Sequence, residues 1–148
     1  MRKLDKVDLQ LIKILSQNSR LTYRELAEML GTTRQRIARR MEKLKKLGII
    51  RKFTVLPDLE KLGYMYAVVL IKLKPMATVD DIINDIAGIE YVKIIEKGIG
   101  KYNLLVHMLV PKDLSEAESR VNEFLSHIKD IENVEVVFIS KVPKFEII

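Results

Sequence analysis

The chain has 148 residues, of which 48% are apolar, and this is sufficient for one medium-sized or two small packed domains. It contains no cysteine and only two histidines, which excludes disulfides and cysteine nucleophiles and argues against a histidine-built metal site. No apolar run approaches the roughly 20 residues that span a bilayer, and no signal peptide is recognisable, so we expect a cytoplasmic protein without a membrane partner.

Charge is divided unequally along the chain. Residues 1–56 carry 15 basic and 5 acidic side chains, whereas residues 57–148 carry 11 basic and 15 acidic ones, within a formal net charge of +6. The composition changes near Pro57. We therefore expect an N-terminal domain over residues 1–56 that binds a polyanion, a linker over 57–63 and a C-terminal domain over 64–148.

The first two predicted helices lie before residue 32. Apolar residues keep helical spacing from Leu4 to Leu15, which predicts the first helix. The second begins at Thr22, where Glu25 completes a capping box, and ends at Gly31, because glycine readily adopts the left-handed conformation. Its predicted buried stripe consists of Leu26, Met29 and Leu30.

The third predicted helix follows a tight turn and completes a helix-turn-helix pattern. Thr32 or Thr33 caps it, and it ends at Gly48. One apolar stripe faces the core and contains Ile37, Met41, Leu44 and Leu47. Two short helices joined in this way are typical of proteins that place the second helix in the major groove of DNA.

The free side of the third helix is strongly basic. Nine basic residues and a single acid, Glu42, lie between Gly31 and Lys52. A charged helix surface is usually only solvated and stabilised by Glu–Lys pairs, but glutamate is almost absent here. The pattern favours neutralisation of nucleic-acid phosphates over a solvated surface.

After Gly48 the periodicity changes from helical to alternating. Ile50, Phe53 and Val55 alternate with polar residues, which predicts a short wing or linker strand that ends at Pro57.

The C-terminal domain reads as strand, helix, strand, strand, helix, strand. We predict strands over residues 64–73, 89–97, 104–110 and 134–142, with helices capped by Thr78 and by a box of Ser115 and Glu118. This order is the ferredoxin-like βαββαβ arrangement, in which both helices cover one face of an antiparallel sheet. The other face would expose apolar residues such as Val68, Leu70, Leu105 and Val136, so we expect association through it, and the alternate set of residues that faces outward stays open at this point.

The sequence resembles the Lrp/AsnC family of leucine-responsive, or feast/famine, regulators over nearly its whole length. The matching residues are Leu4-Asp5, Asp8, Ile14-Leu15, Arg20, Glu25-Leu26-Ala27, Gly31, Thr33, Arg40, Leu44, Gly48, Ile50, Leu62-Gly63 and the glycine turn with Tyr102. The resemblance implies an α+β chain with an N-terminal winged helix-turn-helix that reads double-stranded DNA and a C-terminal ferredoxin-like domain that senses ligands. It also implies homodimers that assemble into tetramers or octamers, with small effectors, usually amino acids, bound between C-terminal domains.

The resemblance and the periodicity together give candidate DNA-binding residues. Thr33 matches the family's capping position, and Arg40 matches its recurrent recognition-helix arginine, for which phosphate contact and an intradomain ion pair remain alternatives. Gln35, Arg36 and Arg39 face outward near the start of the helix and are the candidates for reading bases. The other basic residues of the helix either contact phosphate or are merely solvated, and Lys45, nearest the packed side, is the weakest candidate; they are Arg34, Lys43, Lys45 and Lys46.

The candidate effector site is the turn formed by Gly98, Ile99, Gly100, Lys101, Tyr102 and Asn103. In the family, the turn usually ends in an aspartate that can pair with the ammonium group of an amino acid. This chain has Asn103 there, which offers only an uncharged acceptor. The alternative is that these residues serve turn geometry alone.

The predicted function is sequence-specific DNA binding and transcription regulation, modulated by a small effector such as an amino acid. A low-specificity architectural DNA-binding protein is the first alternative, because high cationic charge also fits that class. A metabolite-binding module or an enzyme is the second, since ferredoxin-like domains host both. No catalytic residues, metal site or cofactor are expected, and His107 fits a core or interface histidine.

Overall fold

The computed structural model describes residues 4–148. Its contacts divide the chain into two units, one ending at Leu56 and including residues 144–148, and the other spanning Pro57–Pro143. None of the helices within the described range has the length and apolar character needed to cross a membrane.

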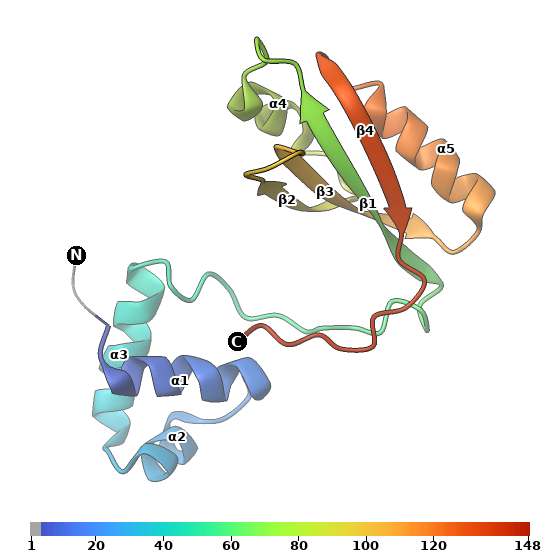
Figure 1. The fold of residues 1–148 in the computed structure, drawn as a ribbon. Coiled ribbons are helices and arrows are strands. Elements are labelled where there is room, and N and C mark those ends of the chain that lie inside the picture. The colour runs from blue at the N-terminus through green and yellow to red at the C-terminus, as the bar shows by residue number, and fades with distance from the viewer. Residues whose placement is uncertain (1–3) are drawn as a thin grey trace. The chain divides into compact units, whose positions relative to one another are not determined.

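The N-terminal unit contains three helices, α1 (Lys6–Gln17), α2 (Tyr23–Leu30) and α3 (Arg34–Lys46) (Figure 1). The predicted capping box is present at the start of α2, where the Thr22 amide donates to Glu25 Oε2 at 2.7 Å and the Glu25 amide donates to Thr22 Oγ1 at 3.2 Å. Gly31 ends this helix with φ at +62°, as predicted. The core of the unit consists of Leu11, Leu15, Leu26, Ala27, Ile37, Met41 and Leu44.

Two residues of the predicted apolar stripes lie outside this core. Met29 is 58% exposed because Leu26 and Ala27 form the inner face of α2, and Met29 lies roughly a third of a turn away at about 100° per residue. Leu47 is 45% exposed and forms the C-cap of α3, so it no longer follows the helical stripe.

The predicted strand over residues 50–55 is not formed. Residues 51–58 have no regular secondary structure, because no backbone hydrogen bond pairs this segment with another strand within residues 4–148. Phe53, Val55 and Leu56 are exposed along it.

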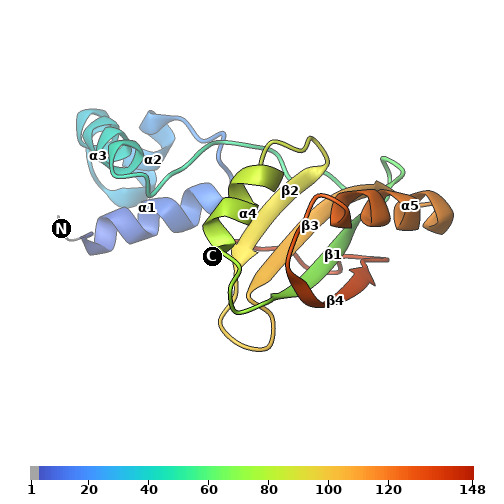
Figure 2. The ribbon, with the colours of Figure 1, turned by 90° about the horizontal axis from the view of Figure 1, so that it is seen from above.

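The C-terminal unit has the predicted βαββαβ order. Its elements are β1 (Tyr64–Leu73), α4 (Val79–Ile86), β2 (Val92–Lys97), β3 (Leu104–Pro111), α5 (Leu114–Leu125) and β4 (Ile131–Phe138). The four strands form an antiparallel sheet in the order β2-β3-β1-β4, and α4 and α5 cover the same face of it (Figure 2). The predicted fold class, α+β with a helix-turn-helix and a ferredoxin-like domain, is confirmed.

The two sheet faces differ in burial. Alternate residues of β1 and β3 that face the helices are buried, among them Val69, Ile71 and Val106. The opposite face, here called the open sheet face, is only partly covered within the chain. It carries Tyr66, Val68, Leu70, Leu105, His107, Leu109 and Val137. Val136 pairs with Val69 and therefore lies on the helix-covered face, so its predicted place on the open sheet face beside Val68, Leu70 and Leu105 is wrong.

Several predicted boundaries in this unit are wrong. The last strand begins at Ile131 and ends at Phe138, because its pairing with β1 runs out at Ala67. Asp113, rather than Ser115, caps α5 by accepting a hydrogen bond from the Glu116 amide at 2.9 Å.

Candidate nucleic-acid interface

Helix α3 is anchored by one face and free on the other. Thr33 caps it, because its Oγ1 accepts a hydrogen bond from the Arg36 amide at 3.3 Å. Ile37, Met41 and Leu44 are buried in the core of the N-terminal unit. The helix is therefore fixed at its start and along one side before any ligand arrives.

The exposed side of α3 carries four of the predicted DNA-binding residues. Arg34, Gln35, Arg36 and Arg39 are all exposed, and their side chains make no hydrogen bond or ion pair within the described part of the chain. Four unpaired donor side chains on one side of a capped helix can reach a phosphate or a base edge without breaking a contact in the protein.

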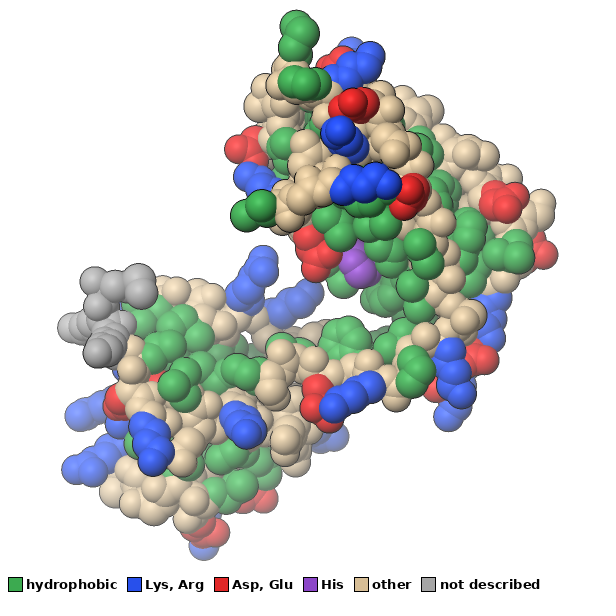
Figure 3. All heavy atoms as spheres, viewed as in Figure 1, with side chains coloured by type: hydrophobic (Ala, Val, Ile, Leu, Met, Phe, Trp, Pro, Cys, Tyr) green, Lys and Arg blue, Asp and Glu red, His purple; other side chains and the backbone are tan. Residues whose placement is uncertain are grey.

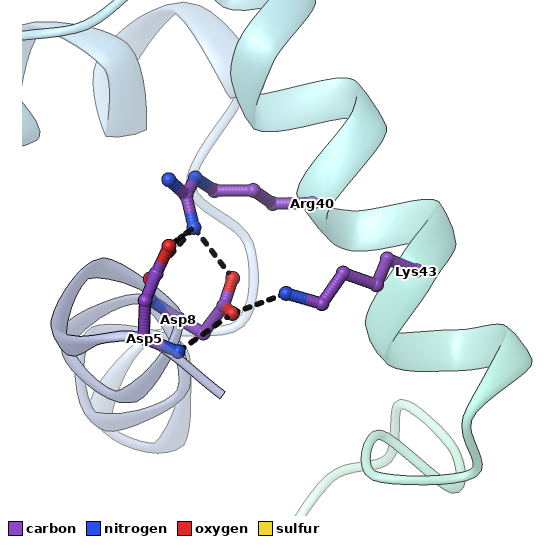
Figure 4. Close-up of polar contacts among 4 residues, drawn as sticks. All are labelled: Asp5, Asp8, Arg40 and Lys43. Atoms are coloured by element: carbon purple, nitrogen blue, oxygen red, sulfur yellow. Dashed lines mark hydrogen bonds and ion pairs between the residues drawn. The ribbon is translucent and has the colours of Figure 1, made fainter. Parts of the chain in front are cut away.

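Arg40 and Lys43 are arranged differently, because both contact α1 and the residue that caps it (Figure 4). Arg40 Nη1 donates to both carboxylate oxygens of Asp5 at 2.7 Å and to Asp8 Oδ1 at 2.8 Å. Lys43 Nζ donates to Asp8 Oδ2 at 2.5 Å. Of the two alternatives for Arg40, the structure contains the intradomain ion pair.

Asp8 is the buried member of this group, hereafter the Asp5–Asp8–Arg40–Lys43 network. Its side chain has 0% exposure, and it is the only charged residue that is buried within residues 4–148. Burial raises the pKa of Asp8, but hydrogen bonds from Lys43 and Arg40 outweigh it and leave the pKa below its ordinary value of 3.8. The hydrogen bond from Arg40 likewise lowers the pKa of Asp5. Both carboxyl groups are therefore ionised at neutral pH.

The surface around α3 is basic and hollowed. Arg36, Arg39, Arg40 and Lys43 line an open hollow together with Asp5. In the space-filling view, basic side chains are spread over the visible face of the N-terminal unit with some acidic ones among them, and acidic and basic side chains are interspersed over the C-terminal unit (Figure 3).

The glycine turn between β2 and β3 is held by its own contacts. The Gly98 amide donates to the Asn103 carbonyl at 3.1 Å, and a Cβ at Gly98 would lie 2.6 Å from the Tyr102 carbonyl oxygen. Asn103 Oδ1 accepts a hydrogen bond from the Leu73 amide at 3.0 Å. Gly98 therefore leaves room for the Tyr102 carbonyl, and the side chain of Asn103 links the turn to the end of β1.

The other residues of the turn lie at its surface or just beneath it. Ile99, Gly100 and Lys101 are exposed, and Lys101 Nζ lies 3.4 Å from Glu135 Oε1. The hydroxyl oxygen of Tyr102 is buried, and its proximity to the Glu135 carboxylate, together with that of Lys101, lowers the pKa of Glu135. The turn thus combines three exposed residues with a buried tyrosine hydroxyl.

The other titratable residues of the part of the chain that the structure describes include no candidate metal site. No group of three or more His, Asp or Glu side chains within the described residues is placed to hold a metal ion. His107 lies on the open sheet face, with Nε2 3.2 Å from Glu96 Oε2 and its ring edge-on to Tyr66.

Comparison with known proteins identifies the group to which this chain belongs. Residues 4–51 match the winged helix-turn-helix DNA-binding family. An uncharacterized HTH-type transcriptional regulator of Pyrococcus abyssi is 69% identical over the whole of both chains. The crystal structure of a Pyrococcus horikoshii relative, 66% identical, superimposes with a TM-score of 0.94 over all of both chains.

More distant solved structures share the complete fold. The structure of E. coli AsnC has a TM-score of 0.81 at 22% identity, over 99% of this chain and 98% of its own. The chain belongs to the Lrp/AsnC family of transcriptional regulators. A Neisseria meningitidis regulator crystallised in complex with L-Met, also 22% identical, has a TM-score of 0.78 over 97% and 94% of the two chains.

The resemblance inferred from the sequence is therefore confirmed, and this Lrp/AsnC protein is a DNA-binding transcription regulator. Its helix-turn-helix consists of α2 and α3, and α3 occupies the position of the helix that enters the major groove in such motifs.

Sequence reasoning did not assign a role to Asp8, although a signal was present. Asp8 follows Leu4 by four residues and precedes Leu11 by three, so it lies within the apolar stripe of α1. An acid in such a stripe needs a cationic partner, and the basic helix α3 contains two.

Proposed function

We propose that this Lrp/AsnC protein is a sequence-specific transcription regulator whose dimer inserts two α3 helices into successive major grooves. The observation that carries the proposal is the free, exposed set of Gln35, Arg36 and Arg39 on a helix that is capped and packed on its other side. Rigid presentation of a few donors is what discrimination between base edges requires.

The roles of the individual residues follow from their chemistry. Arg36 and Arg39 can each donate two hydrogen bonds to guanine, and Gln35 can pair with adenine. Arg34 lies at the N-terminus of α3 beside the Thr33 cap, where a helix start favours a phosphate. We assign Arg34 and Thr33 to the DNA backbone and place the DNA-binding domain over residues 1–56.

The proposal includes a homodimer formed through the open sheet face of the C-terminal domain, residues 64–148, with residues 57–63 as the linker. Val68, Leu70 and Leu105 form the apolar centre of that face, and α4 and α5 cover only the opposite one. A second copy would remove this patch from water, and its two-fold symmetry would match a nearly palindromic site. Assembly of dimers into tetramers or octamers would multiply the number of sites bound together.

We further propose that a small effector of the amino-acid class binds near the turn from Gly98 to Asn103, between C-terminal domains. The related Neisseria regulator was crystallised with L-Met, which supports this class. In this chain Ile99 and Lys101 are exposed, and the Tyr102 hydroxyl oxygen is buried. Asn103 is already bonded to Leu73, so we do not assign it to the effector's ammonium group. The effector would act by binding one assembly more tightly than another.

A second candidate function is that of an architectural protein that coats DNA in the cytoplasm with little sequence preference. Nine basic residues between Gly31 and Lys52 favour it, because phosphate neutralisation alone gives tight, salt-dependent binding. We propose no catalytic role, since the relatives reported above are named regulators.

Selection of bound duplexes from a random-sequence library tests the proposal. The wild-type chain should enrich a nearly palindromic sequence whose half-sites lie about one helical turn, roughly 10 base pairs, apart. Parallel selections with each of the common amino acids should change the enrichment or the spacing for at least one of them. Recovery of sequences no different from the input library would favour the architectural function instead.

A further inference from the structure

We propose that Asp8 is a positioning residue for DNA recognition, acting through Arg40 and Lys43. Its carboxylate holds both cations against α1, withdraws them from phosphate contact and fixes the rotation of α3 that presents Gln35, Arg36 and Arg39. The inference rests on the DNA-binding role of α3 and adds to it a residue that does not itself touch DNA.

Within the Asp5–Asp8–Arg40–Lys43 network, both oxygens of Asp8 contact α3. Each oxygen of Asp8 has its own cation on α3: Oδ1 accepts from Arg40 and Oδ2 accepts from Lys43. The second oxygen also accepts from the Asp5 amide at 3.1 Å, within the capping box of α1. Because Arg40 and Lys43 lie about one turn apart on the same side of α3, a single carboxylate grips that helix at two successive levels.

The burial of the Asp8 carboxylate keeps Arg40 and Lys43 from moving to DNA phosphates. The Asp8 side chain has 0% exposure, whereas those of Arg40 and Lys43 have 27% and 26%. A buried carboxylate is tolerated only with close cationic partners, and moving either cation to a DNA phosphate would leave its charge uncompensated. Phosphates therefore compete poorly for these two side chains, although both lie on the basic helix.

Asp5 completes the arrangement from a more exposed position. Its side chain is 52% exposed and holds Arg40 through both oxygens. Loss of Asp8 alone would therefore release Lys43 while Arg40 stays with Asp5. Loss of both acids would release both cations toward the hollow that Arg36 and Arg39 line.

Release of these cations to DNA phosphates would change the salt dependence of binding to DNA of random sequence. This measurement does not require a known operator. Each phosphate neutralised adds about 0.9 to the slope of the logarithm of affinity against the logarithm of salt concentration. The Asp8→Asn variant should steepen this slope by about 0.9, and Asp5→Asn with Asp8→Asn by about 1.8. Asparagine also serves as an N-cap, so Asp5→Asn preserves the start of α1.

The matched control is Glu28→Gln, which removes one negative charge from the same unit. Glu28 is exposed on α2, and its partner Arg24 lies one turn away on the same helix. This variant should leave the slope within about 0.3 of wild type, because it releases no cation on α3. If Glu28→Gln steepened the salt slope as much as Asp8→Asn does, the change in net charge alone would explain the effect, and the proposal would be overturned.

Specificity gives the second readout. With the duplex enriched by selection, Asp8→Asn should lower the ratio of affinities for the enriched and scrambled duplexes at least threefold, while binding to the scrambled duplex does not weaken. A purely stabilising role predicts the opposite pattern: both affinities fall together, and the slope stays constant. If selection enriches no sequence, the proposed function fails, and the slopes on random duplex still decide this inference.

A third variant covers the case in which Asp8→Asn does not fold. Asp5→Asn and Asp8→Asn combined with Arg40→Met and Lys43→Met leave no unpaired charge in the network, so this variant should retain helical circular dichroism. Its slope on random duplex should equal that of wild type, because neither cation contacts phosphate in the wild-type protein. A slope lower by about 1.8 would show that Arg40 and Lys43 do bind phosphates and would contradict the proposal.

Discussion

Arg40 Nη1 lies 2.8 Å from Oδ1 of Asp8, a fully buried carboxylate on the first turn of α1. This contact links the middle of α3 to α1, and both helices contribute residues to the core of the N-terminal unit. It distinguishes two groups among the arginines and Lys43 of α3. Arg34, Arg36 and Arg39 are exposed and unpaired within the described residues, whereas Arg40 and Lys43 are paired with Asp5 and Asp8.

Acid should destabilise the N-terminal unit through Asp8. The pKa of Asp8 is lowered in the folded state, so its contribution is complete above the ordinary value of 3.8 and is lost as the pH falls through the lower, folded value. At about pH 7, Asp8→Asn should reduce the free energy of unfolding by about 1.5 to 3 kcal/mol, the usual contribution of hydrogen bonds to a charged group. Urea denaturation at about pH 7 and about pH 3 should show this difference shrinking in acid. A difference that is the same at both pH values would contradict the assignment.

The open sheet face should hold the dimer together. Leu70→Glu places a charge at the centre of that face, where a partner would bury it, and sedimentation velocity should show a shift from dimer to monomer. Ser119→Asp is the matched control, because it adds a charge to an exposed position of α5 on the covered side of the sheet. Unchanged sedimentation of Leu70→Glu would place the interface elsewhere.

Gly98 should tolerate no side chain. The Cβ of Gly98→Ala would lie 2.6 Å from the Tyr102 carbonyl oxygen and 2.9 Å from Leu105 Cδ1. Overpacking of this kind destabilises by about 1 to 3 kcal/mol, and thermal unfolding should report it. Gly88→Ala meets no atom within 4 Å and should change stability by less than about 0.5 kcal/mol. Equal melting temperatures for the two variants would show that the turn gives way at little cost.

Asn103 should serve β1 rather than an effector. Asn103→Ala leaves the Leu73 amide without its acceptor and should destabilise the chain by about 1 to 3 kcal/mol. Asn103→Asp retains an acceptor oxygen and should stay closer to wild type in urea denaturation. If both variants unfold like wild type, the hydrogen bond to Leu73 contributes nothing and the side chain is free for a ligand.

The sequence was a good guide where structure depends on neighbouring residues. The box of Thr22 and Glu25, the left-handed Gly31 and the Thr33 cap were predictable because each acts within one helical turn. The wing strand over residues 50–55 and the end of β4 were predicted wrongly, because a strand exists only where another strand pairs with it.

Predictions about the candidate site likewise succeeded for local features and failed for contacts between residues far apart in the sequence. Helical periodicity correctly placed Gln35, Arg36 and Arg39 on the exposed side of α3. Helical periodicity could not identify the partners of Arg40, because Asp5 and Asp8 lie more than 30 positions earlier in the chain. The hydrogen bond from Leu73 to Asn103 was hidden for the same reason, since 30 positions separate the two residues. Such contacts depend on how whole elements pack.

The most direct test of the account compares wild type and Arg39→Ala on the duplex enriched by selection and on a scrambled duplex of equal composition. Arg39 is exposed and unpaired on α3 within the described structure, so its loss should weaken binding to the enriched duplex by about 1 to 3 kcal/mol. Binding to the scrambled duplex, measured by fluorescence anisotropy at the same salt concentration, should weaken much less. Equal weakening on both duplexes would mean that Arg39 contacts only phosphate, and it would contradict the claim that α3 reads sequence.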